Sequence, residues 1–169
     1  MERMTDKPTK PVSGRTTSPN SPEFMKFISG GWAEETNVLP SRAEAADYAA
    51  KRRAVVAEAF AGKILVIEAG GTQVRSNDTE YRYRPNTAFA HLTGWGAATV
   101  PDSVLVIDAR AHAHHSQLFF RKTAGRETEE FFTNSLIGEF WVGQRPGLES
   151  IASLLNLETN DLADLDDRV

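Results

Sequence analysis

The spacing of hydrophobic and polar residues changes along this chain, from a helical period before residue 62 to short apolar runs after it. A short helix is predicted after Ser21 and Pro22, which suit the cap and the first position of a helix, and glycines at 30–31 end it. The residues that share its apolar face are Phe24, Phe27 and Ile28.

A longer helix is predicted between Pro40 and Gly62, and Ser41 and Glu44 have the spacing of a capping box at its start. Its apolar side consists of Ala45, Ala49, Val56 and Phe60. The arginines at 52–53 interrupt that side, so we expect them to reach solvent or a carboxylate.

Short apolar runs rich in β-branched residues at 64–67, 104–107 and 118–120 are typical of buried strands. The polar connection at 112–115 predicts a hairpin between the second and third, and 87–92 is a weaker strand candidate. Two further helices are expected at 126–132 and 147–157. The pattern therefore predicts an α/β domain with a mixed sheet flanked by helices.

Both ends of the chain differ from this middle part. Residues 1–22 hold four of the eight prolines, no aromatic residue and a charge of +2, so a flexible tail is expected before a domain at 23–169. Residues 158–167 carry five carboxylates, which indicates a frayed acidic segment.

Composition narrows the functional classes. A chain of 169 residues with 40% hydrophobic residues suits one domain, and a net charge of -4 argues against a general nucleic-acid binder. The chain has no cysteine, which excludes disulfides, thiolate zinc sites and a cysteine nucleophile. It has no apolar run of about 18 residues. We expect a cytoplasmic protein without a membrane partner.

Local motifs for chemistry are weak. Glycines at 70–71 follow a strand but lack a phosphate-loop pattern, so a turn is the simpler interpretation. A metal site would need carboxylates near the histidines, whereas only Asp108 is close in sequence to His112, His114 and His115. The acidic end lacks the spacing of a calcium loop at Asp161, Asp164, Asp166 and Asp167. No catalytic constellation is found.

Residues 77–94 read NDTEYRYRPNTAFAHLTG, and this stretch resembles the signature of the N-terminal domain of aminopeptidase P, an Xaa-Pro aminopeptidase of the creatinase/prolidase family. The matching positions are Tyr81, Tyr83, Arg84, Asn86, Phe89, Leu92, Thr93 and Gly94. The family often has glutamine at the place of Pro85 and an aromatic residue at that of His91. Three further segments resemble the same domain in the same order: the helix with 51–53, PDSVLVI at 101–107 and EFWVGQRPG at 139–147.

The resemblance implies a ribonuclease-H-like mixed sheet that this chain leaves incomplete at its C-terminal end. It implies that Arg84 and Asn86 are buried polar groups that tie a turn to the sheet, with Phe89 and Leu92 in the core. It also implies that Trp141 binds substrate as an aromatic wall, contributed across a subunit contact.

In this family a C-terminal pita-bread domain holds two metal ions, usually manganese, through two aspartates, a histidine and two glutamates. The ions activate water to cleave the bond before proline. The chain supplies no such set, so we expect a catalytically silent N-terminal part of an enzyme that acts on Xaa-Pro peptides and forms a homo-oligomer. Two alternatives remain: a stand-alone module that binds a peptide or protein, and a metal-binding protein that uses the histidines.

Overall fold

The computed structural model describes residues 21–33, 38–77 and 79–166. Of the tail predicted at 1–22, residues 1–20 lie outside the described part, and 21–22 begin a helix. The described residues form two compact units, one of 21–33 with Thr123–Arg145 and one of 38–122 with 146–166. Each unit is described by itself.

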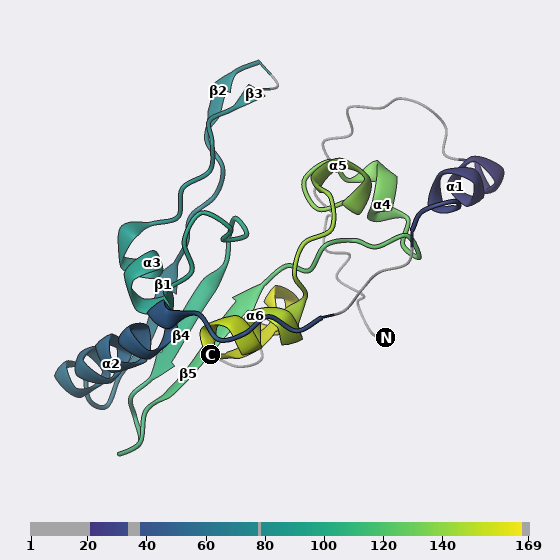
Figure 1. The fold of residues 1–169 in the computed structure, drawn as a ribbon. Helices are drawn as coiled ribbons and strands as arrows, with labels where there is room; N and C mark the ends of the chain where they lie inside the picture. The colour runs from purple at the N-terminus through teal and green to yellow at the C-terminus, as the bar shows by residue number, and fades with distance from the viewer. Residues whose placement is uncertain (1–20, 34–37, 78, 167–169) are drawn as a thin grey trace, which may run out of the picture. The chain divides into compact units, whose positions relative to one another are not determined.

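The larger unit contains a four-stranded sheet in the order β1-β4-β5-β6 (Figure 1). Its strands are β1 (Ile64–Glu68), β4 (Val104–Asp108), β5 (His115–Phe120) and β6 (Glu158–Asp161). β4 pairs with both β1 and β5 in antiparallel fashion, whereas β5 and β6 are parallel, so the mixed sheet and the β4–β5 hairpin are confirmed. The frayed end predicted at 158–167 is wrong, because its first four residues form β6.

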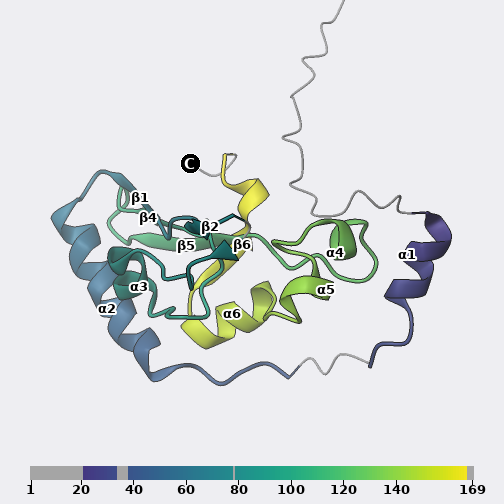
Figure 2. The same ribbon diagram turned by 90° about the horizontal axis from the view of Figure 1, so that it is seen from above.

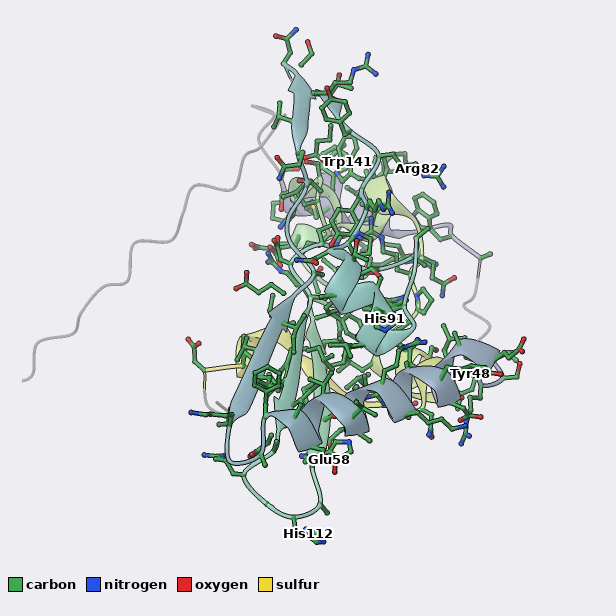
Figure 3. All side chains as sticks on the ribbon, turned by 90° about the vertical axis from the view of Figure 1, so that its left-hand side faces the viewer. Tyr48, Glu58, Arg82, His91, His112 and Trp141 are labelled. Carbon is green, nitrogen blue, oxygen red and sulfur yellow. The ribbon has the colours of Figure 1, made fainter. Side chains whose placement is uncertain are left out.

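Three helices cover one face of this sheet: α2 (Glu44–Ala59), α3 (Thr87–Thr93) and α6 (Leu148–Leu155) (Figure 2). The capping box predicted for α2 is wrong, because the helix begins at Glu44 after Ala43, with no side-chain cap. Its buried positions are Ala46, Ala49, Arg53 and Ala57, so Ala45 and Phe60 are exposed. Tyr48 and Glu58 lie on its exposed side (Figure 3).

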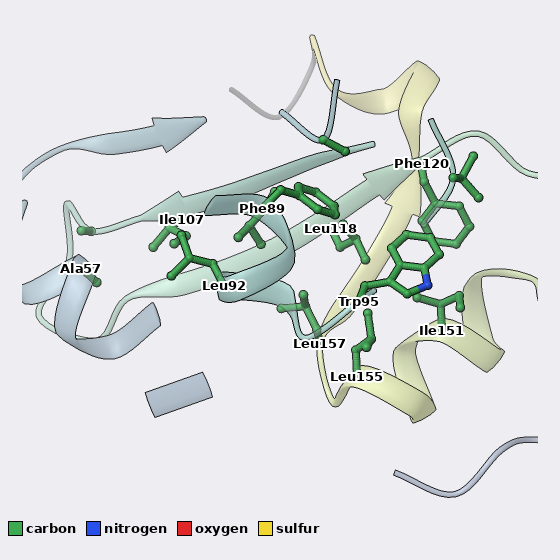
Figure 4. Packing of buried hydrophobic residues seen from close by; sticks show 14 residues of the cluster. Ala57, Phe89, Leu92, Trp95, Ile107, Leu118, Phe120, Ile151, Leu155 and Leu157 are labelled. Atoms are coloured by element: carbon green, nitrogen blue, oxygen red, sulfur yellow. The ribbon is translucent and has the colours of Figure 1, made fainter. Parts of the chain in front are cut away.

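The strand predicted at 87–92 is a helix instead. The Asn86 side chain caps α3 by accepting the Ala88 N–H at 3.0 Å, and Gly94 ends it in the left-handed conformation with φ of 73°. Phe89 and Leu92 are buried in the core between helices and sheet, as predicted (Figure 4). The opposite face of the sheet buries Val104, Val106 and Phe119, with Leu162 and Leu165 packed against them.

A small hairpin of β2 (Val74–Ser76) and β3 (Thr79–Glu80) projects from the larger unit beyond α3 (Figure 1). Its strand residues are exposed on both faces. This hairpin was not predicted, because the polar residues at 75–80 do not alternate with apolar ones.

The smaller unit consists of α1 (Pro22–Ser29), α4 (Glu130–Thr133) and α5 (Glu139–Val142). Ser21 caps α1 and Pro22 is its first residue, as predicted. The helix predicted at 126–132 is mostly turn. A parallel bridge between Ala124 and Gly138 brings the start of α5 beside residue 124.

Candidate functional site

Trp141, the residue expected to bind substrate, belongs to a cluster of aromatic side chains in the smaller unit. The members of this aromatic cluster are Phe24, Trp32, Phe131, Phe132, Phe140 and Trp141. They come from α1, α4 and α5 and the segment after α1. Trp32 and Phe132 were not predicted as site residues, although aromatic residues recur in this part of the chain.

The rings of this cluster pack mostly edge to face. The Trp141 ring lies 5.4 Å from Phe132, tilted by 31°, and 5.1 Å from Phe140, edge on. Phe140 in turn lies 4.9 Å from Phe132 and 5.9 Å from the buried Phe131. Such geometries stabilise aromatic pairs by about 0.5–1.5 kcal/mol beyond burial, so the cluster holds Trp141 in one orientation.

The orientation of the indole decides what it can offer a ligand. Its Nε1–H donates to the Phe132 carbonyl oxygen at 2.6 Å, and the side chain is still 41% exposed. Because its only donor is used within the chain, Trp141 can present a ring surface to a ligand but no hydrogen bond. It is therefore neither a core tryptophan nor a polar contact residue.

A pair of charged residues lies beside the Trp32 ring of this cluster. The Arg126 guanidinium lies 5.9 Å from the Trp32 ring and 3.6 Å from a Glu139 carboxylate oxygen. Burial lowers the pKa of Arg145, the last residue of the smaller unit. The cluster itself consists of aromatic rings, which offer a ligand apolar surface rather than a reacting group.

The glycines at 70–71 follow the end of β1, as predicted, but they lie in an irregular segment rather than in a turn. The Gly70 carbonyl oxygen accepts from the Tyr83 hydroxyl at 2.8 Å and from the Asp102 N–H at 3.0 Å, so acceptors rather than donors point into this loop. Gly70 has φ of 81°, a conformation that suits glycine.

The histidines do not converge on a metal site. His112 lies at the tip of the β4–β5 hairpin (Figure 3), whereas the His115 ring pairs with Glu158 of β6 at 2.8 Å. Among the residues that the structure describes, no three His, Asp or Glu side chains lie close enough to hold a metal ion. Asp161 caps the turn after β6 and lies 3.4 Å from Lys122, and Asp167 is outside the described residues.

Two expectations about polar groups are wrong. Arg84 and Asn86 are exposed rather than buried, although Asn86 does tie its turn to the sheet, through an N–H bond of 2.8 Å to the Ala69 carbonyl oxygen. The arginines of α2 donate to carbonyl oxygens rather than to carboxylates, and only Arg52 is also partly exposed to solvent. Arg52 donates to His91 at 2.7 Å, and the buried Arg53 donates to Leu92 at 2.8 Å. These carbonyls lie at the end of α3, where helix acceptors lack internal partners.

In the parts of the chain that the structure describes, no helix combines the length and the hydrophobicity that crossing a bilayer requires.

Comparison with known proteins places the fold in a family. The sequence profile of the aminopeptidase P N-terminal domain matches residues 48–169. The chain therefore belongs to this family of domains. Over 146 residues, or 86% of the chain, it is 36% identical to Xaa-Pro aminopeptidase 1 of Streptomyces coelicolor. Over 143 residues, or 84% of the chain, it is 33% identical to Xaa-Pro aminopeptidase 2 of that organism.

Solved structures agree with this assignment. Aminopeptidase P of Escherichia coli superposes with a TM-score of 0.57 at 26% identity, over 73% of this chain and 26% of that chain. Proline aminopeptidase P II of Yersinia pestis gives a TM-score of 0.58 at 27% identity, again over 73% and 26% of the two chains. The present chain spans 29% of the length of the first Streptomyces relative.

Proposed function

We propose that the chain acts as the N-terminal, non-catalytic part of a metal-dependent Xaa-Pro aminopeptidase. Its role is to support assembly into an oligomer and to shape the mouth of a pocket for peptides with proline at the second position. The family assignment over residues 48–169 is the observation that carries this proposal.

The hydrolytic chemistry belongs outside the described residues. The two manganese ions that the family resemblance implies need a set of carboxylates and a histidine, and the described residues bring no such group together. They do not fit the ions, so no step of hydrolysis is assigned to this chain, and we expect the chain alone to be inactive.

Within this proposal Trp141 contacts the bound peptide. Its ring is held by Phe132 and Phe140, its N–H is already used, and its exposed surface suits an apolar group such as a proline ring. A partly exposed aromatic surface also suits a contact with a second subunit.

The first test is to read the coding frame beyond the codon for Val169. If the frame continues into a domain with two aspartates, a histidine and two glutamates in ligand positions, the encoded enzyme should cleave Xaa-Pro peptides. A stop codon at that point would overturn the proposal in favour of a stand-alone binding module.

Trp141 is tested in the encoded enzyme. Trp141→Ala should lower kcat/KM on longer Xaa-Pro peptides about fivefold, the equivalent of roughly 1 kcal/mol of lost ring contact, while Trp141→Phe should keep most of the activity. Phe60→Ala is the control, because Phe60 is a 50% exposed aromatic residue in the other unit. Equal kcat/KM for folded Trp141→Ala and the parent would remove Trp141 from the substrate site.

A further inference from the structure

A pocket of about 410 Å³ lies between the base of the β2–β3 hairpin and α3, wholly within the larger unit. Its lining comes from the segment after β3, from α3 and from the loop after α3, and consists of Arg82, Tyr83, Arg84, Pro85, Thr87, Ala90, Gly96 and Ala97. Figure 3 shows Arg82 between the hairpin and α3. This volume is within the usual range of small-ligand sites.

The segment that carries the two arginines is held in place by hydrogen bonds before and between them. Before them, the Tyr81 N–H donates to the Gln73 carbonyl oxygen at 2.9 Å. Between them, the Tyr83 hydroxyl donates to Gly70 at 2.8 Å and reaches Ala69 at 3.2 Å. The pocket wall is thus fixed to the end of β1 before any ligand arrives, which lowers the entropy cost of binding.

The two guanidinium groups have no counter-charge in this wall. Neither Arg82 nor Arg84 forms an ion pair with any residue that the structure describes. The nearby Glu80 carboxylate accepts from the Thr72 hydroxyl at 3.1 Å and does not line the pocket. Two cationic residues, Arg82 and Arg84, therefore line a space whose remaining lining is largely apolar: Pro85, Ala90, Gly96 and Ala97.

The available donors favour a carboxylate over a phosphate. Phosphate sites usually rely on clustered backbone N–H groups. Here Pro85 has none, the Asn86 N–H donates to Ala69, and the Ala88 N–H donates to the Asn86 side chain. Arg82 and Arg84 add two planar guanidinium groups, and a guanidinium group binds a carboxylate through paired hydrogen bonds.

We propose that this pocket binds a peptide carboxylate carried next to an apolar side chain. Arg82 and Arg84 bind the carboxylate, and Pro85, Ala90 and Ala97 contact the apolar group. The carboxylate can be a chain terminus or an acidic side chain, since both present the same two oxygens. This site does not depend on Trp141 or on the enzymatic role proposed above.

The test uses the full chain, labelled with ¹⁵N, and follows the amide signals of Thr87, Ala90, Gly96 and Ala97 by NMR. N-acetyl-leucine carries both features of the ligand, N-acetyl-leucinamide lacks the charge, and acetate lacks the apolar group. We expect N-acetyl-leucine to shift these signals saturably and the other two to bind at least about tenfold more weakly. N-acetyl-glutamyl-leucinamide then tells whether a side-chain carboxylate binds as well as a terminal one.

The matched variants are Arg82→Gln with Arg84→Gln, and Arg75→Gln as the control. Arg75 is exposed on β2 and does not line the pocket. The double variant should weaken N-acetyl-leucine binding at least about tenfold, and the control by less than about twofold. The proposal is overturned by equal binding of acid and amide, by tighter binding of inorganic phosphate, by an unaffected double variant, or by no shift with any probe.

Discussion

Gly138 is the position where a single added methyl group should disturb the aromatic cluster most. It precedes α5, and its carbonyl oxygen accepts the N–H groups of Trp141 at 2.9 Å and Val142 at 3.1 Å. A Cβ built on Gly138 would lie 2.6 Å from the Asn134 carbonyl oxygen, and closer still to those of Glu130 and Phe131. Its φ of -64° is ordinary, so the strain of Gly138→Ala would come from contact alone.

The free-energy cost of Gly138→Ala depends on which atoms would have to move to make room for the methyl group. All three oxygens belong to the backbone of α4 and its end, so no side chain can rotate away from the new methyl group. The Gly138 N–H also donates to the Asn134 oxygen at 2.7 Å, which fixes the two segments against each other. Added methyl groups in packed regions cost about 1–3 kcal/mol, and we expect Gly138→Ala to lie at the upper end of that range.

Hydrogen exchange measures this loss of stability at individual amide groups. The Trp141, Val142 and Gly143 amides are bonded within α5 and its end, so they should exchange roughly 30-fold or more faster in Gly138→Ala, as about 2 kcal/mol implies. Gly147→Ala is the matched control. Gly147 precedes α6 with φ of -76°, and nothing lies within 4 Å of its added Cβ.

Equal exchange rates of the α5 amides in Gly138→Ala and Gly147→Ala would contradict this prediction. Slower exchange in α5 of Gly138→Ala would also contradict it, because the methyl group would then fill space rather than collide with the backbone oxygens of α4 and its end.

Three further predictions concern the larger unit. Asn86→Ala should lower the free energy of unfolding by about 1 kcal/mol in urea titrations because α3 loses its cap, whereas Asn86→Asp should restore most of it. Hydrogen bonds from Arg110 lower the pKa of Asp108 to about 2, so in Arg110→Gln an NMR titration should give a pKa nearer the ordinary 3.8. Burial opposes ionisation of Glu158, but hydrogen bonds led by the one from Gln117 lower its pKa overall. Its contribution to stability is therefore present above pH 4.5 and lost as pH falls through the lowered pKa, and Glu158→Gln should flatten the dependence of urea midpoints on pH in that range.

The elements that the sequence predicted well are those specified by their own residues. β1, β4 and β5 contain short runs of large apolar residues, which favour strands. The apolar runs of β4 and β5 are buried as predicted, whereas β1 lies at the edge of the sheet and is only partly buried, with Val66 49% exposed. The start of α1 was also predictable, because Ser21 and Pro22 act on the backbone next to them.

The elements that were missed depend on partners far along the chain. β6 reads ETND, a polar stretch with no strand signal, and it is a strand because it pairs with β5 some forty residues earlier. In α3 the short apolar run fits strand and helix equally, and the Asn86 cap decides for the helix. The aromatic cluster could not be predicted from local sequence patterns either, since the exposure of Trp141 depends on where Phe132 lies.

The chain's two pairs of arginines show why binding residues cannot be separated from structural ones by sequence alone. A guanidinium group donates hydrogen bonds to oxygen acceptors whether its role is to bind a ligand or to support the fold. Residues 52–53 find them in carbonyls at the end of α3, and Arg53 is thereby accommodated at 4% exposure. Arg82 and Arg84 stand in the family signature yet meet no acidic partner among the described residues. A ligand oxygen at this second pair would not have to replace an ion pair with any described residue, whereas at Arg53 it would have to break a hydrogen bond already made. Free energy for binding an anion is therefore available at the hairpin base and not at α2.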